Sequence, residues 1–124
     1  MDAPTPKSEI KYDFKESFDI KSNKNKDIKL TISYNERIIL FEAEELNIFP
    51  KKEYSLYQSL NELEKINKYF RQFDNLKEVY ESLKIIISNK NLTVFKEENS
   101  IKLKIINTST NKEFFINLLK TKRY

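Results

Sequence analysis

The chain has 124 residues, contains no cysteine, histidine or glycine, and carries 23 basic and 19 acidic side chains, for a formal net charge of +4 at pH 7. These absences exclude disulfides, thiolate nucleophiles, imidazole bases and glycine-rich phosphate loops. The composition therefore favours a non-enzymatic domain with no catalytic residues, no cofactor and no metal.

Residues 1–15 contain no apolar run. Pro4 and Pro6 stand among small and polar residues, and a mixed-charge segment follows them. We predict a flexible lead-in over residues 1–15 and a single α+β interaction domain over residues 16–124. The lead-in has the features of neither a signal peptide nor a membrane anchor, and no stretch approaches the roughly 20 apolar residues of a spanning helix.

Alternation of apolar and polar residues predicts four strands in the first half of the chain. Leu30, Ile32 and Tyr34 alternate with polar residues, which is typical of a strand with one buried face. The strand that follows is apolar on both faces at its start, which indicates a central position in the sheet. The four strands are predicted at residues 18–21, 29–34, 37–44 and 53–58.

Two amphipathic helices joined by a tight turn are predicted between Ser59 and Asn89. Ser59 with Glu62, and Asn75 with Glu78, have the spacing of a helix cap followed three residues later by an acidic residue. Apolar residues then recur at steps of three and four, so each helix has one apolar face, which we expect to pack against strands on both sides. These residues are Leu60, Leu63, Ile66 and Phe70 in the first helix, and Leu76, Val79, Tyr80, Leu83, Ile86 and Ile87 in the second.

Three further strands are predicted at residues 92–96, 101–105 and 114–119. This order of elements predicts an α+β fold, an antiparallel β-sandwich or curled sheet of about seven strands with the helix pair inserted between strands 4 and 5. Because asparagine tolerates left-handed backbone better than other non-glycine residues, we expect it at turns and helix ends. The candidates are Asn35, Asn89, Asn91, Asn99 and Asn111.

The corner between the helices combines aromatic side chains with an arginine. We expect Phe70 and Phe73 to fill the junction between helices and strands, and Asp74 to cap the second helix. Tyrosine and arginine are frequent anchors of protein interfaces, so the corner is also a candidate docking surface. The candidate protein-interaction residues are Tyr69, Phe70, Arg71 and Phe73.

Acidic residues cluster at two places, Glu42, Glu44 and Glu45 after a strand and Glu97-Glu98 in a turn. Such groups could form a metal site or an acid-base pair. The spacing of a calcium loop or a glycosidase site is missing, so we expect solvated charges.

Between residues 101 and 124 there are six basic residues and one acidic residue. If the last two strands form a hairpin, its basic side chains could share a face that contacts phosphates. The residues between them are aliphatic and are expected to face inward, whereas nucleic-acid modules place stacking aromatics there. The candidate nucleic-acid residues are Lys102, Lys104, Lys120, Lys122 and Arg123.

The segment from Tyr54 to Leu83, YSLYQSLNELEKINKYFRQFDNLKEVYESL, is similar to a domain of protist proteins of unassigned function. Together with the order of elements, it resembles the globular head shared by the centriolar cartwheel protein and the end-joining DNA-repair scaffold. This resemblance implies a β-sandwich capped by the helix pair, working as an assembly head in front of a coiled coil or repeat region. Cartwheel heads associate through a hydrophobic residue at a hairpin tip, but the corresponding residues 107–111 are polar here.

We therefore expect a non-enzymatic protein-interaction or scaffold-assembly domain with a cytoskeletal or centriole-related role and an intracellular, cytoplasmic location. The expected partner is a protein, and a second copy of the chain is one candidate. We expect no binding to a membrane. An accessory nucleic-acid-binding domain that uses the basic C-terminal hairpin is the alternative.

Overall fold

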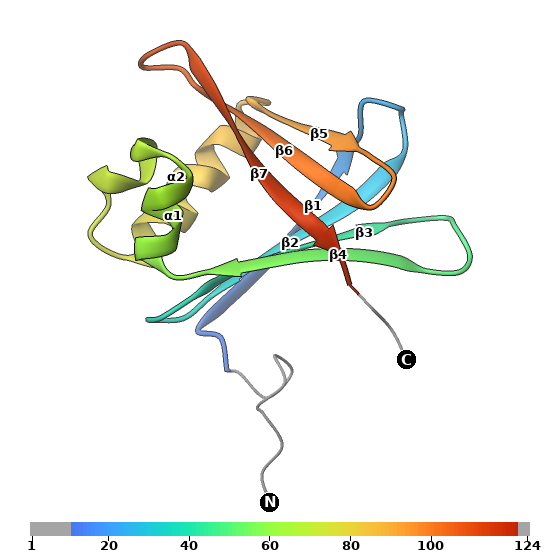
Figure 1. Ribbon diagram of the computed structural model, residues 1–124, viewed down its shortest axis with the longest axis horizontal. Coiled ribbons are helices and arrows are strands. Elements are labelled where there is room, and N and C mark those ends of the chain that lie inside the picture. Colours follow the sequence, from blue (N-terminus) through green and yellow to red (C-terminus); the bar gives the residue numbers. More distant parts are fainter. Residues whose placement is uncertain (1–10, 122–124) are drawn as a thin grey trace, which may run out of the picture.

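The computed structural model describes residues 11–121 and shows an α+β fold with seven strands (Figure 1). The predicted order of four strands, a helical segment and three strands is confirmed. Of the predicted lead-in, residues 1–10 lie outside the described residues, and β1 begins within the rest of it. The elements are β1 (Phe14–Lys21), β2 (Asp27–Tyr34), β3 (Ile39–Glu45), β4 (Lys52–Gln58), α1 (Leu60–Ile66), the 3₁₀ helix η2 (Lys68–Gln72), α2 (Leu76–Ser88), β5 (Leu92–Lys96), β6 (Ser100–Asn107) and β7 (Lys112–Lys120).

The strands form one curled antiparallel sheet in the order β1-β2-β3-β4-β7-β6-β5. The two halves of the sheet meet between β4 and β7, where only Tyr54–Lys120 and Ser55–Leu119 pair. A single bridge between Ser22 and Val94 joins the far ends of the sheet, near β1 and β5. The sheet therefore encloses a core on its inner face, with openings that other elements must fill.

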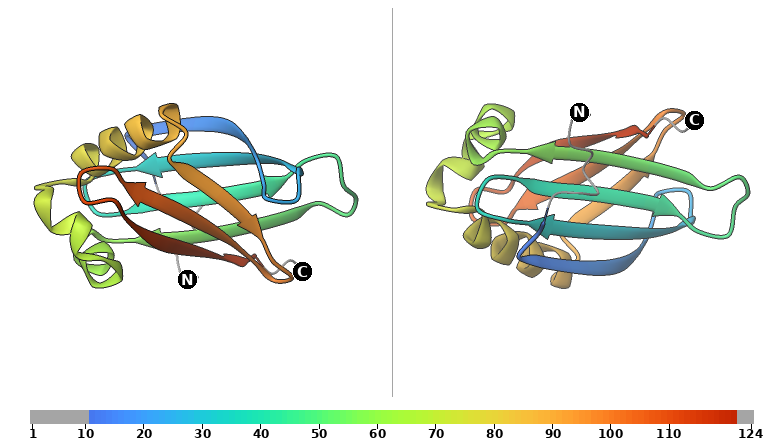
Figure 2. Two further views of the ribbon diagram at one scale, coloured as in Figure 1. Left: turned by 90° about the horizontal axis from the view of Figure 1, so that it is seen from above. Right: turned by 90° about the horizontal axis from the view of Figure 1, so that it is seen from below.

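The helices fill these openings at one end of the curled sheet (Figure 2). Tyr80 of α2 packs its ring against Phe14 and Tyr34, and its hydroxyl donates a hydrogen bond to the carboxylate of Glu16. Phe70 of η2 contacts the ring edge of Phe114 in β7. The expectation that the helices bury their apolar faces against strands from both flanks is thus confirmed.

The first helix is shorter than predicted, because α1 ends at Ile66 and η2 begins at Lys68. Asn67 between them has extended backbone, and its side chain accepts a hydrogen bond from the Tyr69 amide at 2.8 Å. A short polar side chain that competes for backbone donors in this way ends one helix and starts the next. The break turns Phe70 into the core.

The cap of α2 is Asn75, not Asp74. The Asn75 side chain accepts a hydrogen bond from the Glu78 amide at 2.9 Å, and the Glu78 carboxylate accepts one from the Asp74 amide at 2.8 Å. The predicted cap pair of Asn75 and Glu78 is therefore present, but Asp74 takes part only through its backbone.

Left-handed backbone occurs at asparagine in three of the four places where the described residues have it. Asn111 is one of the predicted positions, and Asn25 and Asn47 were not predicted. After α2 it is Lys90 that has φ of 61°, between the candidates Asn89 and Asn91. Asn35 stabilises its turn through its side chain, because its side-chain oxygen accepts hydrogen bonds from the Arg37 and Ile38 amides, at 2.8 and 2.9 Å.

Candidate protein-interaction surface

The four residues predicted at the helical corner have different environments. Phe70 is fully buried, Tyr69 and Phe73 are half-buried, and Arg71 is exposed. The Tyr69 ring contacts Phe70, Phe73 and Phe114 edge-on or tilted, and its hydroxyl forms a hydrogen bond with the hydroxyl of Ser82 on α2. Tyr69 is therefore fixed by both helical segments and by β7, which makes the corner rigid.

A groove lies where η2, α2 and the tip of the β6–β7 hairpin meet, and we call it the corner groove. It has a volume of about 570 Å³. Ile85 in the last turn of α2 lines it and is 61% exposed. The other lining residues are Tyr69, Gln72, Glu81, Ser82, Ile86, Ile106, Asn107, Thr108, Ser109 and Thr110.

A second groove of about 340 Å³ lies on the other side of Tyr69 and Gln72. Its walls are polar except for Tyr69 and Phe114, and they include Lys68, Lys112 and Glu113. The two grooves share Tyr69 and Gln72 of η2, and the corner groove differs in presenting the exposed side chain of Ile85, whose apolar surface gains free energy when it is covered.

The predicted basic residues do not all lie on one face. Lys102 and Lys104 lie on the outer face of β6, where they form ion pairs with Glu97 at 3.5 Å and Glu113 at 3.6 Å. Lys120 lies on the opposite side of its strand from Leu119, so its side chain is on the inner side, near the sheet end. Lys122 and Arg123 lie outside the described residues.

The residues between the lysines of β6 face inward, as predicted, but neighbouring strands place aromatic rings beside Lys102 and Lys104. Phe95 in β5 pairs with Lys102, and Phe115 in β7 pairs with Lys104 and is 47% exposed. The Lys104 ammonium lies 5.6 Å from the centre of the Phe95 ring. Sequence reasoning missed this combination because the register of three strands creates it.

The acidic residues after β3 also divide between two environments. Glu42 and Glu44 line a polar cleft of about 180 Å³ on the outer face, together with Lys15 and Lys29. Glu45 is only 7% exposed, and its Oε2 atom has no hydrogen-bond partner among residues 11–121. The prediction of a solvated charge is wrong for Glu45, because the strand's alternation turns this side chain inward. Within residues 11–121 no three acidic side chains are grouped as a metal site.

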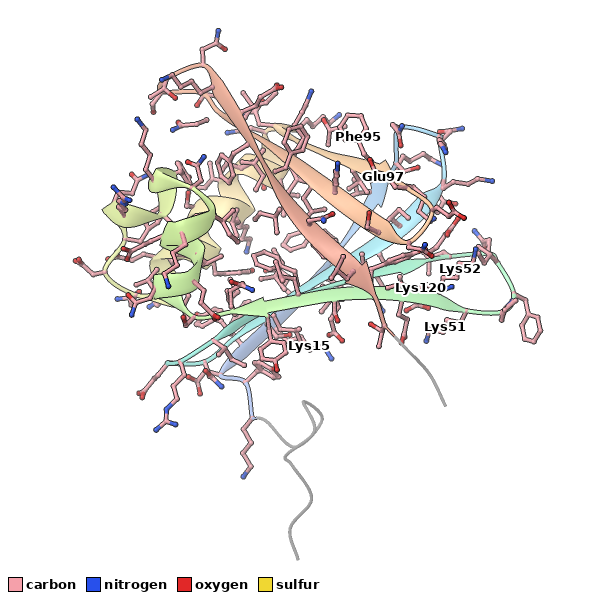
Figure 3. All side chains as sticks on the ribbon, viewed as in Figure 1. Lys15, Lys51, Lys52, Phe95, Glu97 and Lys120 are labelled. Atoms are coloured by element: carbon pink, nitrogen blue, oxygen red, sulfur yellow. The ribbon has the colours of Figure 1, made fainter. Side chains whose placement is uncertain are left out.

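Figure 3 shows Lys51, Lys52 and Lys120 at the end of the sheet that lies opposite the helices, and Lys15 apart from them. The connection between β3 and β4 at this end carries Phe49, which is 98% exposed. Neither Phe49 nor Ile85 was predicted as a contact residue. Three consecutive isoleucines, 85–87, cannot all face one side of a helix, which is the signal that could have identified Ile85.

No protein-family model matches the chain, and no curated protein or solved structure is significantly similar to it. Among the helices of residues 11–121, none is both long enough and apolar enough to cross a membrane.

Proposed function

We propose that this chain is a non-enzymatic protein-interaction domain and that it binds a protein partner through the corner groove. The observation that carries this proposal is the exposure of Ile85 in a groove that Tyr69 also lines, where Tyr69 is held by its contacts with Ser82, Phe73 and Phe114. A contact surface that is already ordered loses little conformational entropy on binding.

The order of elements supports a more specific role. Four antiparallel strands, a helical segment and three strands are what the resemblance to the cartwheel and end-joining repair heads implies. We extend the proposal to a scaffold-assembly head with a cytoskeletal or centriole-related role inside the cell. In this chain the polar β6–β7 tip borders the groove instead of carrying an apolar contact residue.

Site-specific photo-crosslinking tests the proposal. A photoreactive phenylalanine analogue at position 85, in the chain expressed in its native cells, should crosslink to a protein. The same analogue at position 119 is the matched control, since Leu119 is 59% exposed but lies on the outer face of β7. Equal crosslinking from both positions, or none from position 85, would contradict the proposal.

The outer face of β5, β6 and β7 supports a second candidate function, binding of single-stranded nucleic acid. Phe95 and Phe115 lie beside Lys102 and Lys104 there, and stacking aromatics next to basic side chains are typical of such surfaces. Binding to a random single-stranded oligonucleotide should weaken steeply between about 50 and about 200 mM salt. It should also decrease when Phe115 is replaced by alanine; an unchanged Phe115→Ala variant would contradict this assignment.

A further inference from the structure

The connection between β3 and β4 presents an exposed aromatic side chain on an anchored loop. We call residues 46–51 the Phe49 tip. At its base the Leu46 amide donates a hydrogen bond to the Asp27 carbonyl at 2.9 Å, and the Asn47 side chain donates one to the Asp27 carboxylate at 3.3 Å. Residues 46–50 carry no charge, Pro50 is exposed, and the Phe49 ring is 98% exposed. The tip is therefore an apolar protrusion that is tied to the neighbouring hairpin at its base.

The shape of the loop end favours contact with a flat, soft surface. Figure 2 shows the connection between β3 and β4 projecting beyond the rest of the sheet, at the end of the long axis that lies opposite the helices. The connection between β1 and β2 lies behind it in both views of Figure 2. The Phe49 tip can therefore reach a broad surface before other described elements collide with it. A single protruding ring can enter a deformable layer of lipid headgroups, whereas a rigid protein face must supply a matching pocket.

Two lysines lie beside the base of the tip. Lys24 and Lys26 are exposed in the connection between β1 and β2, which ends at Asp27, the residue that ties down the tip. Neither lysine forms an ion pair with another described residue. Three acidic side chains at the base of the tip are already paired, Asp27 with Lys21 at 2.7 Å, and Glu44 and Glu53 with Lys51 at 3.3 Å each. The loop end therefore presents positive charge next to its apolar ring.

We propose that the loop end binds the surface of an anionic lipid bilayer, with the Phe49 ring inserted among the headgroups and with Lys24 and Lys26 facing the lipid charges. Aromatic rings favour the headgroup region, and anionic lipids attract lysines near the surface. One ring and two lysines give weak, reversible binding. The sequence-based expectation of no membrane binding considered apolar segments that could span or anchor, and an inserted ring needs no such segment. This inference goes beyond the proposed function, because the corner groove lies at the opposite end of the molecule.

The Phe49→Trp variant tests the insertion by fluorescence, because the chain contains no tryptophan of its own. With vesicles of phosphatidylcholine containing about 30% phosphatidylserine, its emission should shift to shorter wavelengths, and lipids brominated on their acyl chains should quench it. Leu119→Trp is the matched control, since Leu119 is 59% exposed on the outer face of β7, and its emission should not change. An unshifted emission of Phe49→Trp at about 1 mM lipid would overturn the proposal.

Sedimentation with the same vesicles measures what the ring and the lysines contribute. Phe49→Ser removes the ring and should lower the partition coefficient about tenfold. Lys24→Glu combined with Lys26→Glu reverses both charges and should lower it at least about tenfold at low salt. Lys65→Glu combined with Lys77→Glu changes the net charge equally, on exposed residues of α1 and α2 at the other end, and should have a much smaller effect.

Three other results would contradict the lipid contact. If both charge-reversed variants lose binding equally, the chain binds vesicles through its net charge and not through the loop end. If Phe49→Ser binds as well as the unmodified chain, the ring does not insert. If the unmodified chain binds no vesicles, the proposal is wrong, while a crosslink from position 85 to a protein would still support the proposed function. Circular dichroism of each variant checks that it is folded.

Discussion

The two ends of the curled sheet differ in what covers them. At the helical end, α1, η2 and α2 cover the openings of the sheet, and Phe70 packs into the core against Phe114. At the loop end, the connection between β3 and β4 projects from the sheet and carries Phe49, which is 98% exposed (Figure 2). A buried phenylalanine at one end and an exposed one at the other show that Phe70 belongs to the core and Phe49 does not.

The largest expected effect on stability comes from α2 at the helical end, where Leu83 is buried and Ile85, two residues later, is exposed. Leu83→Asp places a charge in the core, which should abolish cooperative thermal unfolding, a loss of more than about 4 kcal/mol. Ile85→Asp makes the same chemical change two residues later on an exposed side chain and should alter stability by less than about 0.5 kcal/mol. A cooperative melt of Leu83→Asp at the normal temperature would refute the packing of α2.

Replacing one phenylalanine at each end, Phe70 and Phe49, compares the two ends directly. Phe70→Ala leaves a cavity beside Phe114 and Tyr69 and should lower the free energy of unfolding by about 3–5 kcal/mol. Phe49→Ala removes a ring that packs against almost nothing and should change it by less than about 0.5 kcal/mol. Urea denaturation of both variants at a concentration where the chain is monomeric gives the two values. Similar losses would mean that Phe49 also belongs to the core.

A helix cap at the helical end has a smaller effect. Asn75→Ala removes the acceptor of the Glu78 amide and should cost about 1 kcal/mol in urea denaturation. Asn61→Ala, at an exposed position within α1, is the control and should be neutral or slightly stabilising. Equal effects of the two substitutions would show that Asn75 does not cap α2.

The smallest effect is expected at the loop end, in an exposed ion pair. The hydrogen bond from Lys21 to Asp27, at 2.7 Å, and the charge of Lys21 hold the pKa of the Asp27 carboxyl below its ordinary value of 3.8. Because the folded pKa is the lower one, the pair stabilises the fold above the unfolded pKa, and this contribution is lost as the pH falls through the folded pKa.

Lys21→Met should therefore raise the Asp27 pKa towards 3.8, measured by NMR titration of the carboxyl. The melting temperature should be slightly lower than that of the unmodified chain near neutral pH, and the difference should vanish as the pH falls through the folded pKa of Asp27. A difference in melting temperature that persists in acid would show that Lys21 acts through contacts other than this pair.

Much of the fold could be predicted because its signals are local. Alternation in segments such as Leu30–Tyr34 identified the strands, and cap residues such as Ser59 mark where helices begin. The prediction that only one face of Leu30–Tyr34 is buried is wrong, because Thr31 and Ser33 on its other face are buried as well. The break at Asn67 was missed because the apolar spacing continues to Phe70, and the contact of Phe70 with Phe114 joins residues that are far apart in the sequence. The inward side chain of Glu45 was missed because its charge argued against burial.

The candidate surface was harder to predict, because a surface depends on what does not cover a residue. The aromatic corner was identified from its composition, but the groove at Ile85 exists only where the β6–β7 tip comes close to α2. The exposure of Phe49 likewise depends on where the β3–β4 connection ends relative to its neighbours. The apolar and polar pattern of one sequence does not show how close the β6–β7 tip comes to α2 or how far the β3–β4 connection extends.

The narrow seam between β4 and β7 has a consequence for how the chain reaches its native topology. All the other pairs of named strands join neighbours along the sequence, so each half of the sheet is a meander that can form from nearby residues. The Tyr54–Lys120 and Ser55–Leu119 pairs, together with the Ser22–Val94 bridge, require a long loop to close. Because loop closure costs entropy before its contacts are gained, we expect two hairpin-rich units to form quickly and their joining, with the helical segment between them, to limit the rate of folding.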